Sequence, residues 1–92
     1  MFVYSNKDIE KKIDEFDRLW AKASSEMSWC VGGSRPPKFD VIKEACEKAI
    51  SLYNEIEKYF KEKGMDVPEH IKYTYKLVKD LHYYASMRKC MR

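Results

Sequence analysis

The residues best suited to chemistry cluster in one short stretch, "SWCVGGSRPPKFD", which spans residues 28–40. Gly32 and Gly33 can adopt positive φ and leave their backbone N–H groups open to a ligand. Arg35 and Lys38 follow, just before an expected helix. Backbone amides, two cations and a helix N-terminus can together bind a phosphate group. The stretch therefore predicts an anion-binding loop, with a plain connector between two helices as the alternative.

Two neighbouring residues bear on this choice. Trp29 could stack on a base or could cover the end of a helical bundle. Asp40, the expected N-cap of the following helix, would place a negative charge close to a bound anion. The loop is not a P-loop, because no strand precedes the glycines and the Lys-Ser/Thr ending is missing. The candidate ligand contacts in the loop are Trp29, Ser34, Arg35 and Lys38.

The rest of the chain offers little catalytic chemistry. His70, His82 and the cysteines form no ligand pair spaced three or four residues apart. The sequence "EACE" at residues 44–47 would suit half of a carboxylate metal site, but no second half with helical spacing appears. No nucleophile lies in a recognisable catalytic motif. We therefore expect a protein without enzymatic activity, metal or cofactor.

Composition limits the class of protein. The 92 residues suffice for one domain, and 45% are hydrophobic and 14% aromatic, which excludes a disordered tail. No apolar run approaches the roughly 18 residues that span a bilayer. The opening "MFVYSNKD" lacks the basic and apolar regions of a signal peptide. We expect a single cytoplasmic domain over residues 1–92 that does not associate with membranes.

The three cysteines, Cys30, Cys46 and Cys90, are an odd number without C-x-x-C spacing. In the absence of an export signal, we expect reduced thiols that pack as small hydrophobic groups. The alternative is a disulfide-linked dimer through Cys90.

Hydrophobic periodicity predicts three helices, over residues 6–27, 40–63 and 68–89. Gly64 is expected in a left-handed conformation after the second helix, and Pro68 in the first turn of the third. The short connectors favour antiparallel neighbours. The predicted fold is all-α: a three-helix bundle, or a helical hairpin with an added N-terminal helix.

The third predicted helix carries a second apolar stripe, roughly opposite its core stripe. Three helices have too few neighbours to cover both stripes, so we expect a subunit or partner interface and a homo-oligomer. Burial on two sides within the monomer is the alternative. The interface residues are Tyr73, Leu77, Tyr84, Met87 and Met91.

A basic face lies between the two stripes of this helix. Residues 72–92 hold six basic side chains and a single acid, Asp80. Lysines can neutralise phosphate charge while an aromatic ring stacks on a base, so the face suits a phosphate-bearing partner. A simple solvated face is the alternative, and nucleic acid is less favoured because the net charge is only +3. The face comprises Lys72, Lys76, Lys79 and Tyr83.

Two segments, "RPPKFDVIKEACEKAISLYNEI" and "KLVKDLHYYASMRK", resemble the small helical phage proteins that sequester cyclic oligonucleotide signals of bacterial CBASS defence. The chain departs from that family in its added N-terminal helix, and in Trp29 replacing a tyrosine-containing lead into the prolines. The resemblance implies an oligomer without catalysis. Its ligand would lie between subunits, stacked on aromatic rings and contacted by basic side chains. The resemblance rests on Pro36, Pro37, Lys38, Lys76, Leu77 and an aromatic residue near Tyr83.

These observations lead to a predicted function with an alternative. The first is a non-enzymatic phage anti-defence protein that sequesters a cyclic nucleotide or a related phosphate-bearing signalling ligand. The alternative is a protein-interaction inhibitor of a host or defence enzyme, comparable to an anti-CRISPR protein, which docks through the second apolar stripe. Weak nucleic-acid binding through the basic end is a third reading.

Overall fold

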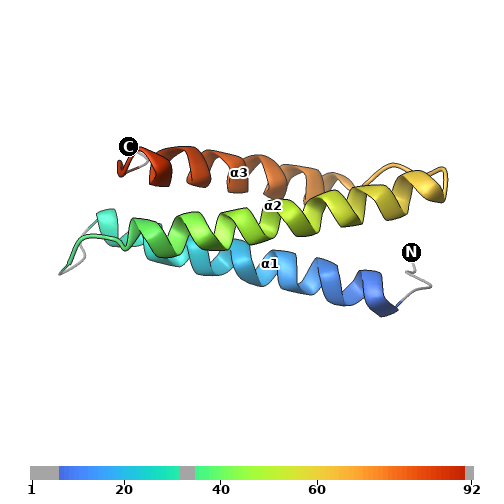
Figure 1. Ribbon diagram of the computed structural model, residues 1–92, viewed down its shortest axis with the longest axis horizontal. Helices are drawn as coiled ribbons and strands as arrows, with labels where there is room; N and C mark the ends of the chain where they lie inside the picture. Colours follow the sequence, from blue (N-terminus) through green and yellow to red (C-terminus); the bar gives the residue numbers. More distant parts are fainter. Residues whose placement is uncertain (1–6, 32–34, 91–92) are drawn as a thin grey trace.

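The computed structural model describes residues 7–31 and 35–90. Within them it contains the α-helices α1 (Lys7–Met27), α2 (Phe39–Glu62) and α3 (Glu69–Ser86), and a short 3-10 helix, η1 (Ser28–Cys30), directly after α1. Figure 1 shows consecutive helices running antiparallel, with α2 between α1 and α3. The bundle is elongated, with extents of 45 × 19 × 18 Å. The all-α helical bundle predicted from periodicity is confirmed.

The apolar faces of the helices meet in one core. Phe16 from α1, Ile56 and Phe60 from α2, and Ile71 and Val78 from α3 are almost fully buried. Burying each such side chain contributes about 1.5–3 kcal/mol relative to leaving it exposed. Among the described residues, every buried side chain belongs to a hydrophobic residue, with the Cys46 thiol and the Tyr53 hydroxyl as the titratable groups. The interior is therefore a packing core.

An aromatic column crosses the bundle. The rings of Tyr53 on α2 and Tyr75 on α3 stack almost in parallel, with centroids 3.8 Å apart. Phe16 on α1 lies 6.0 Å from the Tyr53 ring, and the Lys79 ammonium lies 4.7 Å from the Tyr75 ring centroid. This column joins the middle of α3 to α2. Over its length, α3 contacts α2 more extensively than it contacts α1.

The end of α2 follows the sequence prediction. Gly64 has φ +70°, and its N–H donates to the Lys61 carbonyl at 3.0 Å. The N–H of Met65 donates to the Phe60 carbonyl at 2.9 Å. These two bonds form a Schellman motif, which satisfies carbonyls that the helix leaves unpaired. Glycine adopts the left-handed conformation here without steric cost.

The end of α3 repeats this motif without a glycine. Arg88 has φ +54°, and its N–H donates to the Ala85 carbonyl at 3.0 Å. The N–H of Lys89 donates to the Tyr84 carbonyl at 2.9 Å. A left-handed conformation costs a residue with a Cβ about 1 kcal/mol. This strained turn ends α3 at Ser86, three residues before the predicted boundary at residue 89.

The first residues of α2 and α3 also differ from the prediction. Lys38, with extended φ and ψ, is the N-cap of α2, and the predicted cap Asp40 lies in the first turn. Pro68 is the N-cap of α3, and its carbonyl accepts hydrogen bonds from the N–H groups of Ile71 and Lys72. No side chain caps either helix. The Asp40 prediction was wrong because α2 begins one residue before it, at Phe39, where the Glu26 carboxylate accepts a hydrogen bond from the N–H of the cap residue Lys38.

Candidate functional site

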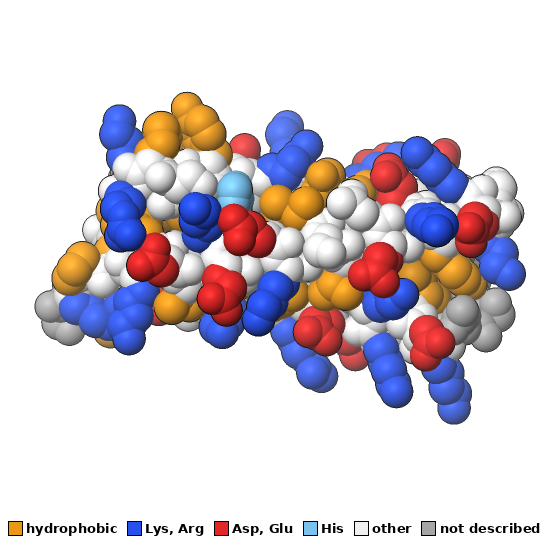
Figure 2. All heavy atoms as spheres, viewed as in Figure 1, with side chains coloured by type: hydrophobic (Ala, Val, Ile, Leu, Met, Phe, Trp, Pro, Cys, Tyr) orange, Lys and Arg blue, Asp and Glu red, His pale blue; other side chains and the backbone are white. Residues whose placement is uncertain are grey.

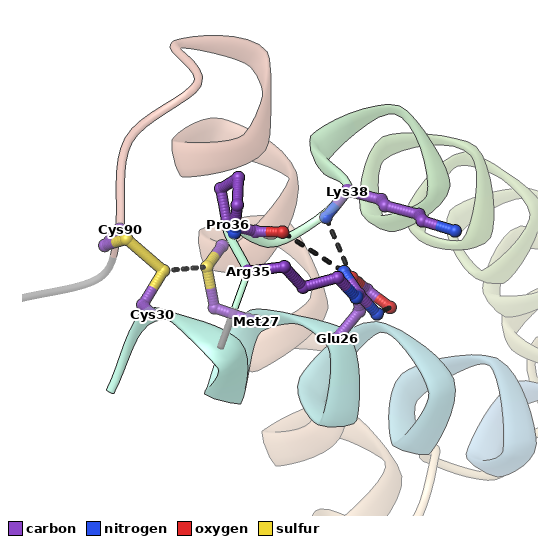
Figure 3. The surroundings of a disulfide bond; sticks show 7 residues. All are labelled: Glu26, Met27, Cys30, Arg35, Pro36, Lys38 and Cys90. Atoms are coloured by element: carbon purple, nitrogen blue, oxygen red, sulfur yellow. Dashed lines mark hydrogen bonds and ion pairs between the residues drawn. A yellow bond between two sulfur atoms is a disulfide. The ribbon is translucent and has the colours of Figure 1, made fainter. Parts of the chain in front are cut away.

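A disulfide joins Cys30, at the end of η1, to Cys90, near the end of the chain (Figure 3). The two Cα atoms lie 5.8 Å apart, and the sequence separation is 60 residues. The expectation of reduced thiols was therefore wrong for these two residues, and so was the alternative of an intermolecular bridge through Cys90. Antiparallel packing creates this pair, because it returns the end of α3 to the α1–α2 connector.

The third cysteine, Cys46, is free and buried, as expected. Burial, together with the nearby Glu47 carboxylate, raises the pKa of its thiol to about 12. A thiol with so high a pKa is almost never a thiolate at neutral pH and does not act as a nucleophile. Cys46 is thus a core residue.

The last turn of α1 presents a carboxylate that organises the connector. The Arg35 guanidinium donates to both carboxylate oxygens of Glu26, at 2.6 and 3.3 Å, and also to the Pro36 carbonyl at 3.1 Å. The Lys38 backbone N–H donates to Glu26 Oε2 at 2.8 Å (Figure 3). The hydrogen bond from Arg35, followed by that from Lys38, lowers the pKa of Glu26 from 4.5 to about 2. Glu26 thus stays ionised over most of the pH range.

This arrangement uses the groups that were predicted to hold a ligand. The Glu26 carboxylate lies at the N-terminus of α2, where a ligand anion would lie. Arg35 is engaged by Glu26 and also stacks over the Trp29 ring at 4.4 Å. The structure thus brings Trp29 and Arg35 together, around an internal anion. Ser34, with Gly32 and Gly33, lies outside the described residues.

Glu26 did not emerge from the sequence reasoning, although a signal was present. It is an acid in the last turn of a helix, where the macrodipole disfavours negative charge and where α1 has no basic residue. An acid in that position suggests a cationic partner in the following connector.

The end of α3 is held by what we call the C-terminal clasp. It consists of the Cys30–Cys90 disulfide, the left-handed turn at Arg88, and an ion pair between Arg88 and Asp40 with an N–O distance of 3.0 Å. Both partners of the ion pair are highly exposed, so the pair contributes at most about 1 kcal/mol. This gain is similar in size to the cost of the left-handed turn. The disulfide is therefore the main constraint on the clasp.

The outer side of α3 is where large apolar side chains meet solvent. Tyr73 is 64% exposed, Tyr83 60% and Met87 41%. Lys72 and Lys76 are exposed beside them, and neither side chain has an ion-pair or hydrogen-bond partner among residues 7–31 and 35–90. Figure 2 shows hydrophobic side chains standing beside Lys and Arg side chains along the α3 edge of the molecule. The predicted basic face thus lies in solvent, with Lys79 turned towards Tyr75.

The second apolar stripe divides between this surface and the monomer interior. Tyr84 packs against the core, and Leu77 is half-buried. Leu77 lines a hollow of about 120 Å³ together with Trp20, Ser24 and Leu81. Tyr73 and Met87 remain exposed, and Met91 lies outside the described residues. Burial within the monomer, the alternative reading of the stripe, applies to Tyr84 and in part to Leu77.

Other polar residues form no chemical centre. His82 Nε2 lies 3.2 Å from Glu47 Oε2, and both residues are at least partly solvent-exposed. Among the described residues, no group of three or more His, Cys, Asp or Glu side chains gathers as metal ligands would. In the same part of the chain, no helix has the length and apolar character needed to cross a bilayer.

Comparison with protein-family models, with curated proteins and with solved structures finds no match to this chain. Function is therefore inferred from the surface itself.

Proposed function

We propose that this protein is a non-enzymatic protein-binding module that docks an acidic partner through the outer side of α3. Three of the five large hydrophobic side chains that are exposed among the described residues lie on this helix or its cap, and this observation carries the proposal. Exposed apolar patches usually mark association, and tyrosines are frequent binding hot spots. The docking face comprises Tyr73, Tyr83 and Met87 with Lys72, Lys76 and Lys79.

The charge of the docking face favours a partner of opposite sign. Lys72 and Lys76 lack ion-pair partners in the described part of the chain, although Glu69 lies three residues before Lys72 and Asp80 four residues after Lys76. Two copies meeting through this face would bring like charges together, which disfavours the contact. An acidic protein surface would neutralise the lysines and cover the tyrosines. The predicted homo-oligomer becomes an alternative outcome of the test.

Affinity capture with matched variants tests the proposal. An acidic protein retained by the wild type should be lost with Tyr73→Ala/Tyr83→Ala, because hot-spot truncations cost about 2 kcal/mol or more each. Lys72→Glu/Lys76→Glu should also release it, and added salt should weaken binding of the wild type. Lys43→Glu/Lys58→Glu, on exposed positions of α2, carries the same charge change and should retain the partner.

Two results would contradict this proposal. One is a retained protein that the α2 control releases as readily as the α3 variants. The other is a dimer that forms at high concentration in light scattering and is lost with Tyr83→Ala, because that result assigns the face to self-association.

A phosphate-bearing ligand, such as a cyclic nucleotide, is a second candidate for the same helix. It is favoured by the unpaired lysines Lys72 and Lys76 near the exposed Tyr83 ring, whereas Arg35 in the connector is already engaged by Glu26. Calorimetric titration with cyclic di- and trinucleotides tests it. Binding that is lost with Lys72→Ala/Lys76→Ala but kept with Tyr73→Ala would support this candidate, and absence of heat across the panel would remove it.

A further inference from the structure

The C-terminal clasp anchors the end of α3 that carries much of the docking face. Tyr83 lies in the last turn of α3, Met87 is its C-cap, and Cys90 follows three residues later. Two of the three exposed apolar side chains of the docking face are thus within seven residues of the disulfide. The core residues Leu81, Tyr84 and Ala85 hold α3 up to its last turn, and the clasp holds the residues that follow.

The noncovalent parts of the clasp nearly cancel. The left-handed turn at Arg88 opposes the observed conformation, and the exposed ion pair between Arg88 and Asp40 supports it weakly. The core contacts of α3 nearest this end come from Leu81, Tyr84 and Ala85, and all three lie before residue 87. With the disulfide broken, the described contacts that hold residues 87–90 are backbone hydrogen bonds to the last turn of α3 and the exposed ion pair of Arg88.

Thiol exchange requires access of a second thiol to the disulfide. Cys30 and Cys90 are both half-buried, at one tip of the elongated bundle (Figures 1 and 3). Arg88 and Lys89 immediately precede Cys90, and neighbouring cations favour the thiolate form that takes part in exchange. The remaining thiol, Cys46, is buried and does not compete for pairing.

We infer that the Cys30–Cys90 disulfide is a reversible redox switch that orders the docking face when oxidised and loosens it when reduced. The inference rests on the proposed function. A small thiol such as glutathione attacks one sulfur as the thiolate, breaks the S–S bond and forms a mixed disulfide. A second glutathione then attacks the glutathione sulfur of the mixed disulfide and releases the protein sulfur. The products are two protein thiols and one molecule of oxidised glutathione. Oxidised glutathione drives the reverse exchange.

The oxidation state of Cys30 and Cys90 would also depend on the cellular compartment of the protein. Thiols of the cytoplasm keep most cysteines reduced, whereas disulfides persist in oxidising surroundings. Under the predicted cytoplasmic residence the clasp would open, and outside the cytoplasm it would close. The docking face would thus be ordered only where disulfides persist.

Hydrogen exchange on the full chain tests the switch without any partner. Amides of residues 83–90 should exchange about 10-fold faster after reduction by millimolar glutathione, and equally fast in Cys30→Ser/Cys90→Ser, by a local opening that low denaturant does not accelerate. Core amides that exchange only through global unfolding should instead speed up with denaturant. Oxidised glutathione should restore slow exchange in the wild type only. Ile56→Val weakens the buried core but keeps the disulfide, so it should speed exchange along all helices without singling out residues 83–90.

The outcomes separate the switch from the proposed function. The switch is overturned if reduction leaves the exchange of residues 83–90 unchanged, if that exchange rises with denaturant as core exchange does, or if glutathione cuts the disulfide only on global unfolding. If reduction leaves binding of the captured partner intact while Tyr83→Ala abolishes it, the switch is wrong and the docking face stands. If Tyr83→Ala also leaves binding intact, the proposed function is wrong.

Discussion

The two helix ends at Gly64 and Arg88 have the same pair of backbone hydrogen bonds but different causes. At Gly64 the residue type alone permits the left-handed turn, so the local sequence is sufficient. At Arg88 the residue type opposes the turn, and a disulfide and an ion pair from other parts of the chain hold it. The same motif can therefore be encoded locally or imposed by tertiary contacts.

The difference extends to the two ends of the bundle. The α2–α3 turn needs only its Schellman motif and the burial of Val67. The opposite end joins the α1–α2 connector to the chain terminus through Glu26, Arg35, Asp40 and the Cys30–Cys90 bond. Such an end responds to pH, salt and redox state, whereas the α2–α3 turn should be indifferent to all three.

Removing the disulfide should have the largest effect. Cys30→Ser/Cys90→Ser should lower the free energy of unfolding by about 4 kcal/mol, since the bond closes a loop of some 60 residues in the unfolded chain. In a chain of this size, that loss lowers Tm by roughly 15–30 °C. Thermal unfolding followed by circular dichroism measures it. The reduced wild type should match the variant, and a wild-type Tm that ignores reductant would contradict the prediction.

The next effect is a pH dependence from Glu26. Its pKa is about 2 in the folded protein, below the ordinary 4.5. Its pairing therefore stabilises the fold fully above pH 4.5, and this stabilisation is lost as the pH falls from 4.5 towards 2. The Tm of the wild type should fall over that interval more steeply than the Tm of Glu26→Gln. The two proteins should converge near pH 2.

A matched control isolates this effect. Glu62 on α2 is exposed and has no partner among the described residues, so Glu62→Gln should keep the wild-type pH profile. If Glu26→Gln and Glu62→Gln give the same profile, the network around Arg35 does not stabilise the fold.

The sequence predicts the features that depend on local pattern. Helical periodicity placed the three helices and the core, and Gly64 marked the end of α2, because spacing and residue type act over a few neighbouring residues. It failed for Cys30 and Cys90, which pair across 60 residues, and it missed the ion pair between Asp40 and Arg88 across 48 residues. Those partners are known only once antiparallel packing is known.

The candidate site shows the same limit. The basic and aromatic residues of α3 were named from the helical wheel, and the structure leaves Tyr73, Tyr83 and the lysines exposed. The sequence could not predict which residues of the apolar stripe are covered. Leu77 is partly covered because it faces α1, and Tyr84 because it packs against the core. The engagement of Arg35 by Glu26 likewise required the geometry of the connector.

A smaller effect is expected at Gly64. Gly64→Ala should lower the free energy of unfolding by about 1 kcal/mol, because alanine disfavours a left-handed φ. An added Cβ would meet no atom within 4 Å, so the loss is a backbone effect alone. Urea unfolding with an unchanged m-value measures it. Gly64→Asn should lose less, since asparagine tolerates this conformation, and an alanine variant as stable as the wild type would contradict the argument.

The smallest net effect is expected from the reciprocal change, Arg88→Gly. Glycine removes the cost of the left-handed turn, about 1 kcal/mol, but also removes the exposed ion pair with Asp40, which contributes 0 to about 1 kcal/mol. At low salt the two changes should cancel to within about 0.5 kcal/mol. At about 1 M salt the pair is screened, so the glycine variant should become more stable than the wild type.

Asp40→Asn separates the two contributions, because it removes the ion pair and leaves the backbone unchanged. It should be slightly less stable than the wild type at low salt and equal to it at high salt. If Arg88→Gly is instead destabilised by more than about 1 kcal/mol at high salt, the left-handed turn is not strained. The two helix ends would then differ only in their partners, and the disulfide would be holding a turn that arginine adopts without cost.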